Sequence, residues 1–186
     1  MVILADLNKR IMEMDIRVLV AYASKYGATA EIAERIGQVI GEAGLSADVL
    51  AVEKVEGLAQ YKAVVLGSAV YMGRWRREAA RFMKTNEKVL EGQMVWLFSS
   101  GPTDKGEPLE LVEGLYLPRG LQPVAERIRP KDIVVFHGVA VLEKMNFFDR
   151  WIMKKVKAPM GDFRDWDTIV AWAKSIADEL KEPTFH

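Results

Sequence analysis

Small and hydroxyl-bearing side chains gather in a short stretch between an apolar run and an amphipathic one. The candidate binding residues in this stretch are Ser24, Lys25, Tyr26, Gly27, Ala28 and Thr29. Ser24 and Thr29 supply hydroxyl donors and Lys25 supplies a positive charge. Gly27 lets the backbone turn or come close to a ligand. These residue types suit an anion, and in particular a phosphate monoester.

The flanking residues predict a strand, a tight loop and a helix. Ile16–Tyr22 is an apolar, β-branched run that is typical of a strand buried on both faces. Apolar residues then recur with helical spacing at Ile32, Ile36 and Ile40. The first turn of such a helix presents unpaired N–H groups at the positive end of the helix dipole. The alternative is an ordinary strand-to-helix connection in which Thr29 is only the N-cap.

Two further apolar runs, 63–67 and 94–98, predict strands, and each ends in small or polar residues. Ser68, Ala69, Val70, Tyr71, Met72 and Gly73 follow the first run, and Ser99, Ser100, Gly101, Pro102 and Thr103 follow the second. We interpret both groups as loops at strand ends. Turn chemistry alone would also explain Gly101-Pro102.

Strands that alternate with helices predict an α/β fold with a parallel sheet covered on both sides. We expect further strands at 46–52 and 133–136, and helices at about 75–90, 124–128 and 166–180. The expected order of the five strands is 2-1-3-4-5. Ligands in such sheets lie at the carboxyl ends of the strands where the winding reverses. The loops after the first and third strands would therefore flank one crevice.

The composition limits the classes of function. The chain has 186 residues, which suits one domain over 16–182 after an N-terminal extension at 1–15. It has no cysteine, which excludes thiol chemistry, iron–sulfur ligation and disulfides. The 26 basic and 26 acidic residues balance, so a nucleic-acid partner is not expected, and no metal site is predicted. We expect a cytoplasmic protein, because no apolar stretch is long enough to span a membrane.

Three stretches carry a resemblance to a known family. They are Tyr22-Ala23-Ser24-Lys25-Tyr26-Gly27-Ala28-Thr29 with Glu31-Ile32-Ala33, then Gly67-Ser68-Ala69-Val70-Tyr71-Met72-Gly73, and Phe148-Asp149-Arg150-Trp151-Ile152-Met153-Lys154-Lys155 with Asp165-Trp166. The chain resembles the flavodoxin-fold FMN proteins, and among them the menaquinone-dependent protoporphyrinogen IX dehydrogenase family. The resemblance implies a flavodoxin-like three-layer sandwich and FMN as cofactor. Two features depart from the carriers of this fold: Tyr26 replaces a threonine, and the chain is not acidic.

The three loops match what FMN requires. Residues 24–29 would hold the phosphate, 68–73 would reach the N5 edge of the ring, and 99–103 would offer backbone donors to the pyrimidine edge. Tyr71 or Trp75 would cover the ring by offset stacking. The competing interpretation places Trp75 in the core and Tyr71 on the surface.

No catalytic residue is predicted. In a flavin enzyme the cofactor carries the hydride, so the protein mainly binds, orients and tunes it. His137 is the one candidate acid or base, and a structural histidine at a strand end is the competing interpretation.

Two segments leave their roles open. The long, proline-rich excursion 101–131 is a lid over the flavin, a subunit contact in a homodimer, or a packed surface loop. Residues 144–157 carry five basic side chains and one acidic one, with apolar residues along one helical face. Such a helix suits peripheral contact with the inner face of a membrane or an acidic substrate. The alternative is that its apolar face is core.

Three functions fit these observations. The first is an FMN-dependent oxidoreductase that passes electrons or hydride between a small organic substrate and a quinone-type acceptor. The second is a flavodoxin-type electron carrier with no substrate of its own. The third is a flavin-sensing or interaction domain. The balanced charge and the basic aromatic segment favour the first.

Overall fold

The computed structural model describes residues 16–101, 103, 106–108, 116–141, 143, 145–155 and 159–182, without the side chains of 152–154. The predictions for the N-terminal extension 1–15, for Pro102 and for Lys144 and Lys157 lie outside these residues.

A parallel sheet forms the centre of the molecule. Its strands are β2 (Ser46–Ala51), β1 (Arg17–Ala23), β3 (Ala63–Tyr71), β5 (Met94–Ser100) and β6 (Asp132–Phe136), in that spatial order. The winding reverses between β1 and β3, as the sequence predicts. The predicted α/β class, the five parallel strands and their order are confirmed, with β4 (Arg74–Trp75) as an additional antiparallel partner of β3.

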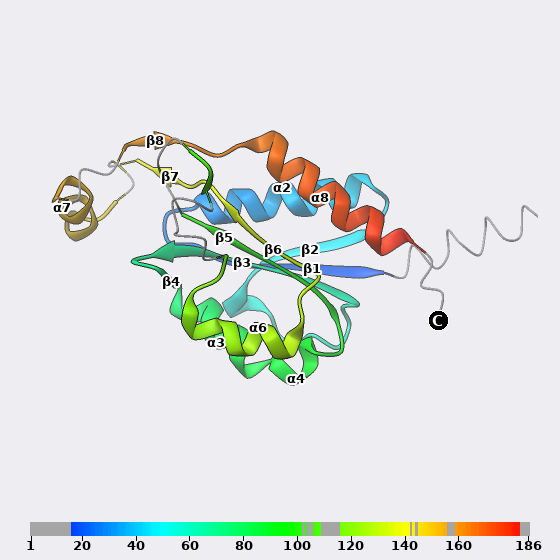
Figure 1. Ribbon diagram of the computed structural model, residues 1–186. Helices are drawn as coiled ribbons and strands as arrows, with labels where there is room; N and C mark the ends of the chain where they lie inside the picture. The colour runs from blue at the N-terminus through cyan, green and yellow to red at the C-terminus, as the bar shows by residue number, and fades with distance from the viewer. Residues whose placement is uncertain are drawn as a thin grey trace, which may run out of the picture.

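Helices cover both faces of the sheet (Figure 1). On one side lie α2 (Ala28–Glu42) and α8 (Trp166–Lys181), and on the other lie α3 (Arg77–Thr85), α4 (Glu87–Leu90) and α6 (Gln122–Ile128). Short 3₁₀ turns occur at Val52–Lys54 and Arg119–Leu121. The three layers match the predicted sandwich, although the helix expected at 75–90 divides at Asn86.

Alternation along the strands builds one core on each side of the sheet. In β1, Val18 and Val20 pack with α2 and α8, whereas Leu19 and Ala21 pack toward α3 and α6. All four are fully buried, which explains the uninterrupted apolar run. Of the apolar residues with helical spacing in α8, Ile169, Ala173, Ile176, Ala177 and Leu180 are buried, whereas Trp166 is exposed.

Two features near the carboxyl ends of the strands differ from the predictions. The strands β3 and β5 continue to Tyr71 and Ser100, into stretches interpreted as loops. A short hairpin, β7 (Val139–Ala140) with β8 (Gly161–Asp162), has no counterpart in the prediction. The basic segment contains helix α7 (Phe147–Lys155), which projects at this end of the molecule (Figure 1).

Candidate functional site

The loop after β1 leads directly into α2. Gly27 is the N-cap and has φ 93°, the left-handed conformation that favours glycine. Its N–H donates to Ser24 Oγ at 3.0 Å. No side chain caps α2, so its first N–H groups remain at the positive end of the helix dipole. The interpretation of Thr29 as a simple N-cap is wrong.

Thr29 instead connects the first group of predicted binding residues, 24–29, with the third group, 99–103. Its Oγ1 lies 3.0 Å from Ser100 Oγ, and both residues are buried. This contact brings the start of α2 against the end of β5. Residues 71 positions apart therefore meet at one edge of the sheet.

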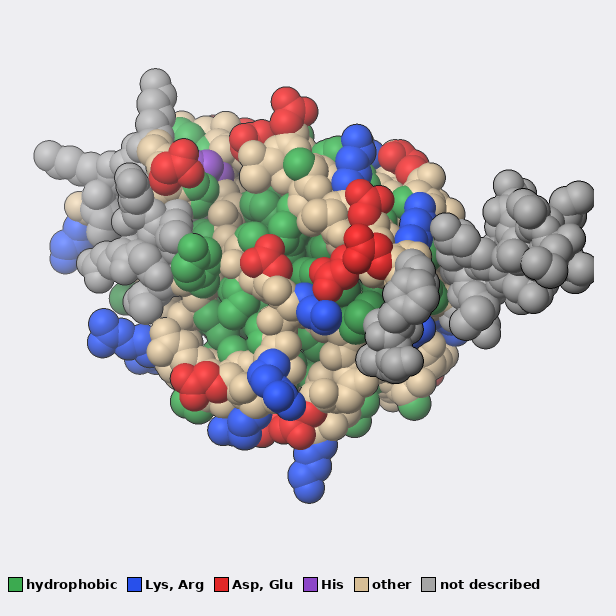
Figure 2. All heavy atoms as spheres, turned by 45° about the vertical axis from the view of Figure 1, so that its right-hand side comes forward, with side chains coloured by type: hydrophobic (Ala, Val, Ile, Leu, Met, Phe, Trp, Pro, Cys, Tyr) green, Lys and Arg blue, Asp and Glu red, His purple; other side chains and the backbone are tan. Residues whose placement is uncertain are grey.

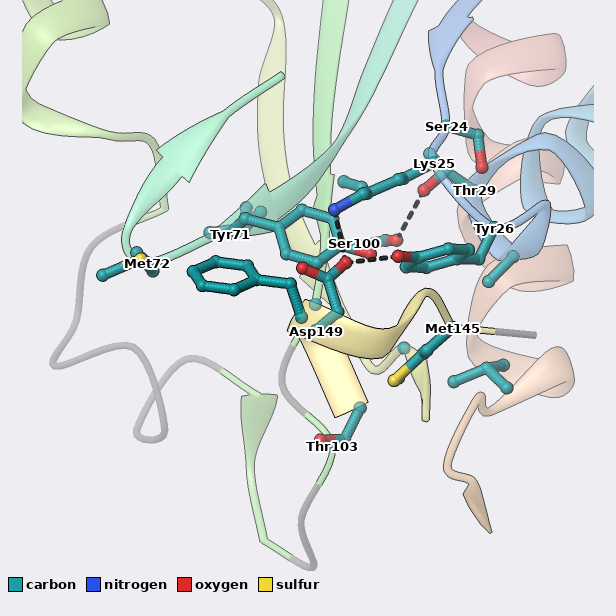
Figure 3. A pocket seen from close by; sticks show the side chains of 17 residues that line it. Ser24, Lys25, Tyr26, Thr29, Tyr71, Met72, Ser100, Thr103, Met145 and Asp149 are labelled. Carbon is teal, nitrogen blue, oxygen red and sulfur yellow. Dashed lines mark hydrogen bonds and ion pairs between the residues drawn. The ribbon is translucent and has the colours of Figure 1, made fainter. Parts of the chain in front are cut away.

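The second group of predicted binding residues, 68–73, forms the end of β3 and the turn of the β3–β4 hairpin. Met72 and Gly73 at its tip have φ 49° and 69°. Positive φ at both central residues is typical of a type I′ turn. Met72 is 89% exposed, and the Tyr71 ring lies beside the pocket (Figure 3).

A cavity of about 550 Å³ lies between these three groups (Figure 3). This volume is within the range of roughly 300–1,000 Å³ that ligand pockets occupy. The predicted residues that line it are Ser24, Lys25, Tyr26, Ala28, Thr29, Ala69, Val70, Tyr71, Met72, Ser100, Gly101 and Thr103. The loops after β1 and β3 thus converge where the winding reverses.

Other predicted residues shape the site without lining the cavity. Ser68 Oγ accepts from the Arg76 N–H at 3.0 Å, and Ser99 Oγ accepts from the Trp75 indole N–H at 2.8 Å. Both serines are buried and point away from the cavity because alternate side chains of a strand face opposite sides. Gly27 and Gly73 contribute backbone turns.

Trp75 belongs to the core. It is buried, it is absent from the cavity lining, and Ser99 occupies its N–H. Of the two candidate aromatic covers, only Tyr71 lines the cavity.

With this geometry established, the chain can be compared with known proteins. A model of the flavodoxin domain family matches residues 19–167. The chain belongs to the flavodoxin domain family. The protoporphyrinogen IX dehydrogenase [quinone] of Escherichia coli (strain K12) is 23% identical over 180 residues, covering 90% of this chain and 98% of that protein.

Solved structures agree on the fold. A flavodoxin from the domain Archaea has a TM-score of 0.62 at 15% identity, covering 90% of this chain and all of that one. The rubredoxin oxygen:oxidoreductase of Desulfovibrio gigas has a TM-score of 0.59 at 12% identity, with 93% of this chain matched to 38% of that one.

FMN is the cofactor of this flavodoxin-family chain. The residues present fit it. The uncapped start of α2 with Ser24 and Thr29 offers donors for a phosphate at one end of the cavity. Tyr71 offers a flat ring at the other. Burial is the main cause that raises the pKa of Tyr71 to about 12.

The structure adds wall residues that the sequence analysis did not assign to the cofactor. They are Gly138, Val139, Met145, Phe148 and Asp149. Gly138 follows β6, and a Cβ there would lie 3.2 Å from Gly101, so this loop packs closely against the end of β5. The sequence feature that could have identified Asp149 is its position as the one acidic residue in the basic segment 144–157.

Asp149 sets the charge balance of the pocket. Lys25 Nζ and Tyr26 OH both donate to its Oδ2 (Figure 3). Burial acts to raise the pKa of Asp149, but the hydrogen bonds from Lys25 and Tyr26 outweigh it and hold the pKa below its usual value. Burial likewise acts to lower the pKa of Lys25, and the bond to Asp149 raises it overall. The positive charge predicted for the phosphate is therefore paired with a carboxylate.

His137 lies outside the cavity lining. Its Nε2 is 2.9 Å from the carbonyl oxygen of Gly106. This contact supports the structural interpretation of His137. Within the described part of the chain, no three His, Asp or Glu side chains are grouped so that they could hold a metal ion.

Proposed function

We propose that this protein is an FMN-dependent oxidoreductase that passes electrons or hydride between a small organic substrate and a quinone-type acceptor. The observation that carries the proposal is the apolar part of the cavity lining, which includes Tyr71, Met72, Met145 and Phe148. These side chains suit a flat, apolar molecule bound beside the ring.

The quinone-linked relative supports the same proposal. Its similarity extends over 90% of this chain and 98% of its own length, so the two proteins match end to end rather than in a shared fragment. Both signs of charge occur on the face shown in Figure 2, and the whole chain is neutral. A neutral substrate or acceptor is compatible with such a surface.

The chain's own residues bind and orient in this proposal. FMN supplies the hydride or electron chemistry when bound. The loop 24–29 would hold the phosphate, the β3–β4 hairpin and residues 99–103 would border the ring, and Tyr71 would cover it. No side chain is assigned as an acid or base.

Anaerobic reoxidation tests the proposal. The purified protein should show flavin absorbance. After reduction it should be reoxidised rapidly by menadione, a soluble naphthoquinone, and slowly by a protein acceptor such as cytochrome c. Protoporphyrinogen IX is the electron donor to try first, because the porphyrin formed by its oxidation is fluorescent and can be followed directly. Failure of menadione to reoxidise the flavin would contradict the proposed acceptor class.

A flavodoxin-type electron carrier is the second candidate. The match to the archaeal flavodoxin over its entire length favours it. A redox titration separates the two, because a carrier should accept electrons in two well-separated one-electron steps at low potential. An enzyme of the proposed type has no such requirement.

We also propose that α7 meets an anionic membrane surface. Phe147 is 85% exposed and Trp151 is 52% exposed, with Lys155 Nζ 4.9 Å from the Trp151 ring centre. Aromatic and basic side chains together favour the interface of an anionic bilayer, where a lipid quinone resides. Among the residues that the model describes, no helix is long and apolar enough to cross a bilayer. A homodimer contact through 101–131 stays a prediction.

A further inference from the structure

Helix α7 is attached to the rest of the molecule by few contacts. Among the described helices and strands, it makes no extensive packing contact with another element, whereas α2 and α8 pack along each other. Its aromatic residues are largely exposed, including Phe148 at 64%. Apolar burial therefore contributes little to holding α7 in place.

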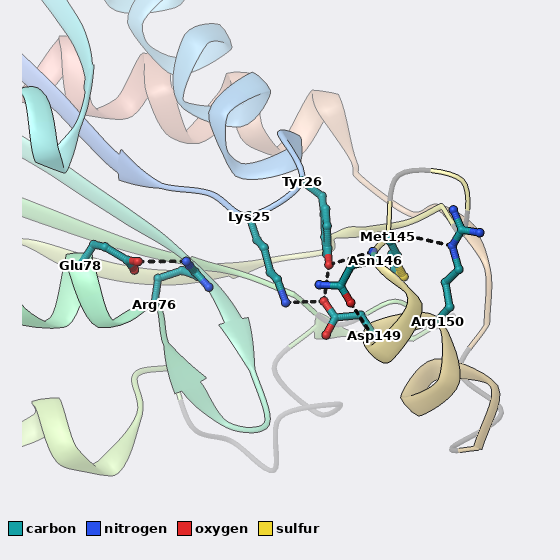
Figure 4. A network of polar contacts seen from close by, with 8 residues as sticks. All are labelled: Lys25, Tyr26, Arg76, Glu78, Met145, Asn146, Asp149 and Arg150. Atoms are coloured by element: carbon teal, nitrogen blue, oxygen red, sulfur yellow. Dashed lines mark hydrogen bonds and ion pairs between the residues drawn. The ribbon is translucent and has the colours of Figure 1, made fainter.

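A polar cluster at the start of α7 supplies the attachment (Figure 4). Asp149 accepts from Lys25 Nζ and from Tyr26 OH, both in the 24–29 loop that we propose holds the cofactor phosphate. Asn146 caps the helix by accepting from the Asp149 N–H at 2.9 Å, and its own N–H lies 3.4 Å from Tyr26 OH. The Asp149 side chain is 14% exposed, so water screens this charge-assisted contact only partly.

The attachment fixes a wall of the pocket. Phe148 is next to Asp149 in the chain and lines the same cavity as Tyr71. Phe147, one residue earlier, does not line the cavity. The orientation in which Asp149 reaches Lys25 is therefore also the one that places Phe148, and not Phe147, at the pocket.

We propose that Asp149 is a positioning residue that holds α7 against the cofactor loop and so makes Phe148 one wall of a slot for the planar, apolar redox partner. The slot rests on the proposed function, whereas the attachment of α7 does not. In this arrangement Lys25 and Tyr26 of the loop bind the helix rather than the phosphate.

Limited trypsin digestion of the full chain without added flavin tests the attachment. Trypsin can cut α7 after Arg150, Lys154 and Lys155. Asp149→Asn should raise the cleavage rate at these sites by roughly tenfold, the effect of losing a hydrogen bond to a charged group. Lys25→Met should act in the same direction, and the double variant should add little. Glu87→Gln is the matched control, because Glu87 pairs with Arg127 on the far side of the sheet. Unchanged cleavage in a folded Asp149→Asn protein, checked by circular dichroism, would overturn the proposal.

Reoxidation of the FMN-loaded chain by menadione tests the slot. Phe148→Ala and Asp149→Asn should raise the KM for menadione on the order of tenfold, with a smaller change in kcat. Phe147→Ala is the neighbouring control and should leave KM unchanged in the absence of membranes. If Phe148→Ala weakens FMN binding and leaves the menadione KM unchanged, Phe148 covers the flavin and the slot is wrong.

The two experiments test the attachment of α7 and the slot beside Phe148 separately. A wild-type protein that menadione does not reoxidise contradicts the proposed function, and the slot with it. The trypsin comparison then still decides whether Asp149 holds α7.

Discussion

Gly27 shows how a single residue can control what the loop after β1 accepts. It has a left-handed φ, and a Cβ built on it would meet only Glu31 Oε1 at 3.9 Å. Space is therefore available for a side chain, and the constraint is the backbone conformation together with the charge at the start of α2.

Gly27→Asp should weaken FMN binding by roughly tenfold or more, because it places a negative charge beside the phosphate. Gly27→Asn is the matched control, since asparagine has the same shape, tolerates a left-handed φ and carries no charge. Flavin absorbance after purification and a fluorescence titration measure the effect. Equal retention by both variants would show that the phosphate lies elsewhere.

The low pKa of Asp149 predicts how the attachment of α7 responds to acid. The pKa in the folded state lies below the ordinary value of 3.8, so the ionised carboxylate stabilises the attached helix. This contribution is complete above the ordinary pKa and is lost as the pH falls through the lowered value. We expect no change between about pH 5 and 8, and release of α7 only below about pH 4.

The fluorescence of Trp151, taken as the difference between wild type and Trp151→Phe, reports this release. The same difference measured on an Asp149→Asn background should show no acid transition. A transition of the wild type near pH 6 would point to a group other than Asp149.

The residues at the strand ends show what the sequence could and could not predict. Hydroxyl and small side chains correctly marked the edge of the sheet where the cavity forms. Ser68 and Ser99 were placed at the ligand because their stretches were interpreted as loops. They lie in strands instead, and alternation turns them toward Arg76 and Trp75.

At the scale of elements, long apolar runs made the five central strands predictable. The hairpins were not, because β4, β7 and β8 are two-residue strands with no periodicity to detect. Helix α7 was recognised from its spacing, but the interpretation of its apolar face as core is wrong for Phe148 and Trp151. Amphipathic spacing alone does not say whether a helix face meets the core, a ligand or a membrane.

Replacing Lys154, Lys155 and Lys157 by glutamate tests the membrane proposal. The charge reversal should abolish co-sedimentation with phosphatidylglycerol liposomes, because each basic residue near an anionic surface contributes about 1 kcal/mol. Phosphatidylcholine liposomes should bind neither protein. The control is a triple variant in which Lys62, Lys84 and Lys88 are changed to glutamate. It has the same net charge as the first triple variant, but the changed residues lie outside α7, so it should bind the liposomes like wild type. Equal loss in both triple variants would indicate a general charge effect rather than docking through α7.

At the scale of the whole molecule, the sheet holds together two separate cores. Phe98 in β5 contacts Phe136 of β6 and Trp172 of α8, with ring centres 5.9 and 6.2 Å apart. Gly67 in β3 makes room for this ring, since a Cβ there would lie 1.9 Å from Phe98 Cζ. The core beneath α2 and α8 therefore depends on the absence of a side chain in the neighbouring strand.

Gly67→Ala should lower the free energy of unfolding by about 1–3 kcal/mol, because the added methyl overpacks this core. The double variant Gly67→Ala/Phe98→Leu should be more stable than the sum of the two single effects predicts, since the smaller leucine makes room for the methyl. Gly41→Ala is the control, because nothing lies within 4 Å of its added Cβ. Urea unfolding measures wild type, both single variants, the double variant and the control, and a Gly67→Ala protein as stable as wild type would contradict this account of the core.

The bond between Lys25 and Asp149 joins positions 124 apart in the chain. Ribosomes add about 5–20 residues per second, so the 24–29 loop is synthesised roughly 6–25 s before its carboxylate partner. By then β1, β3 and β5 have all been made, and the nascent chain can assemble the floor of the pocket while one side is still missing. Capture of FMN during translation would thus begin on an open half-site, and retention would be secured only as the last fifth of the polypeptide arrives.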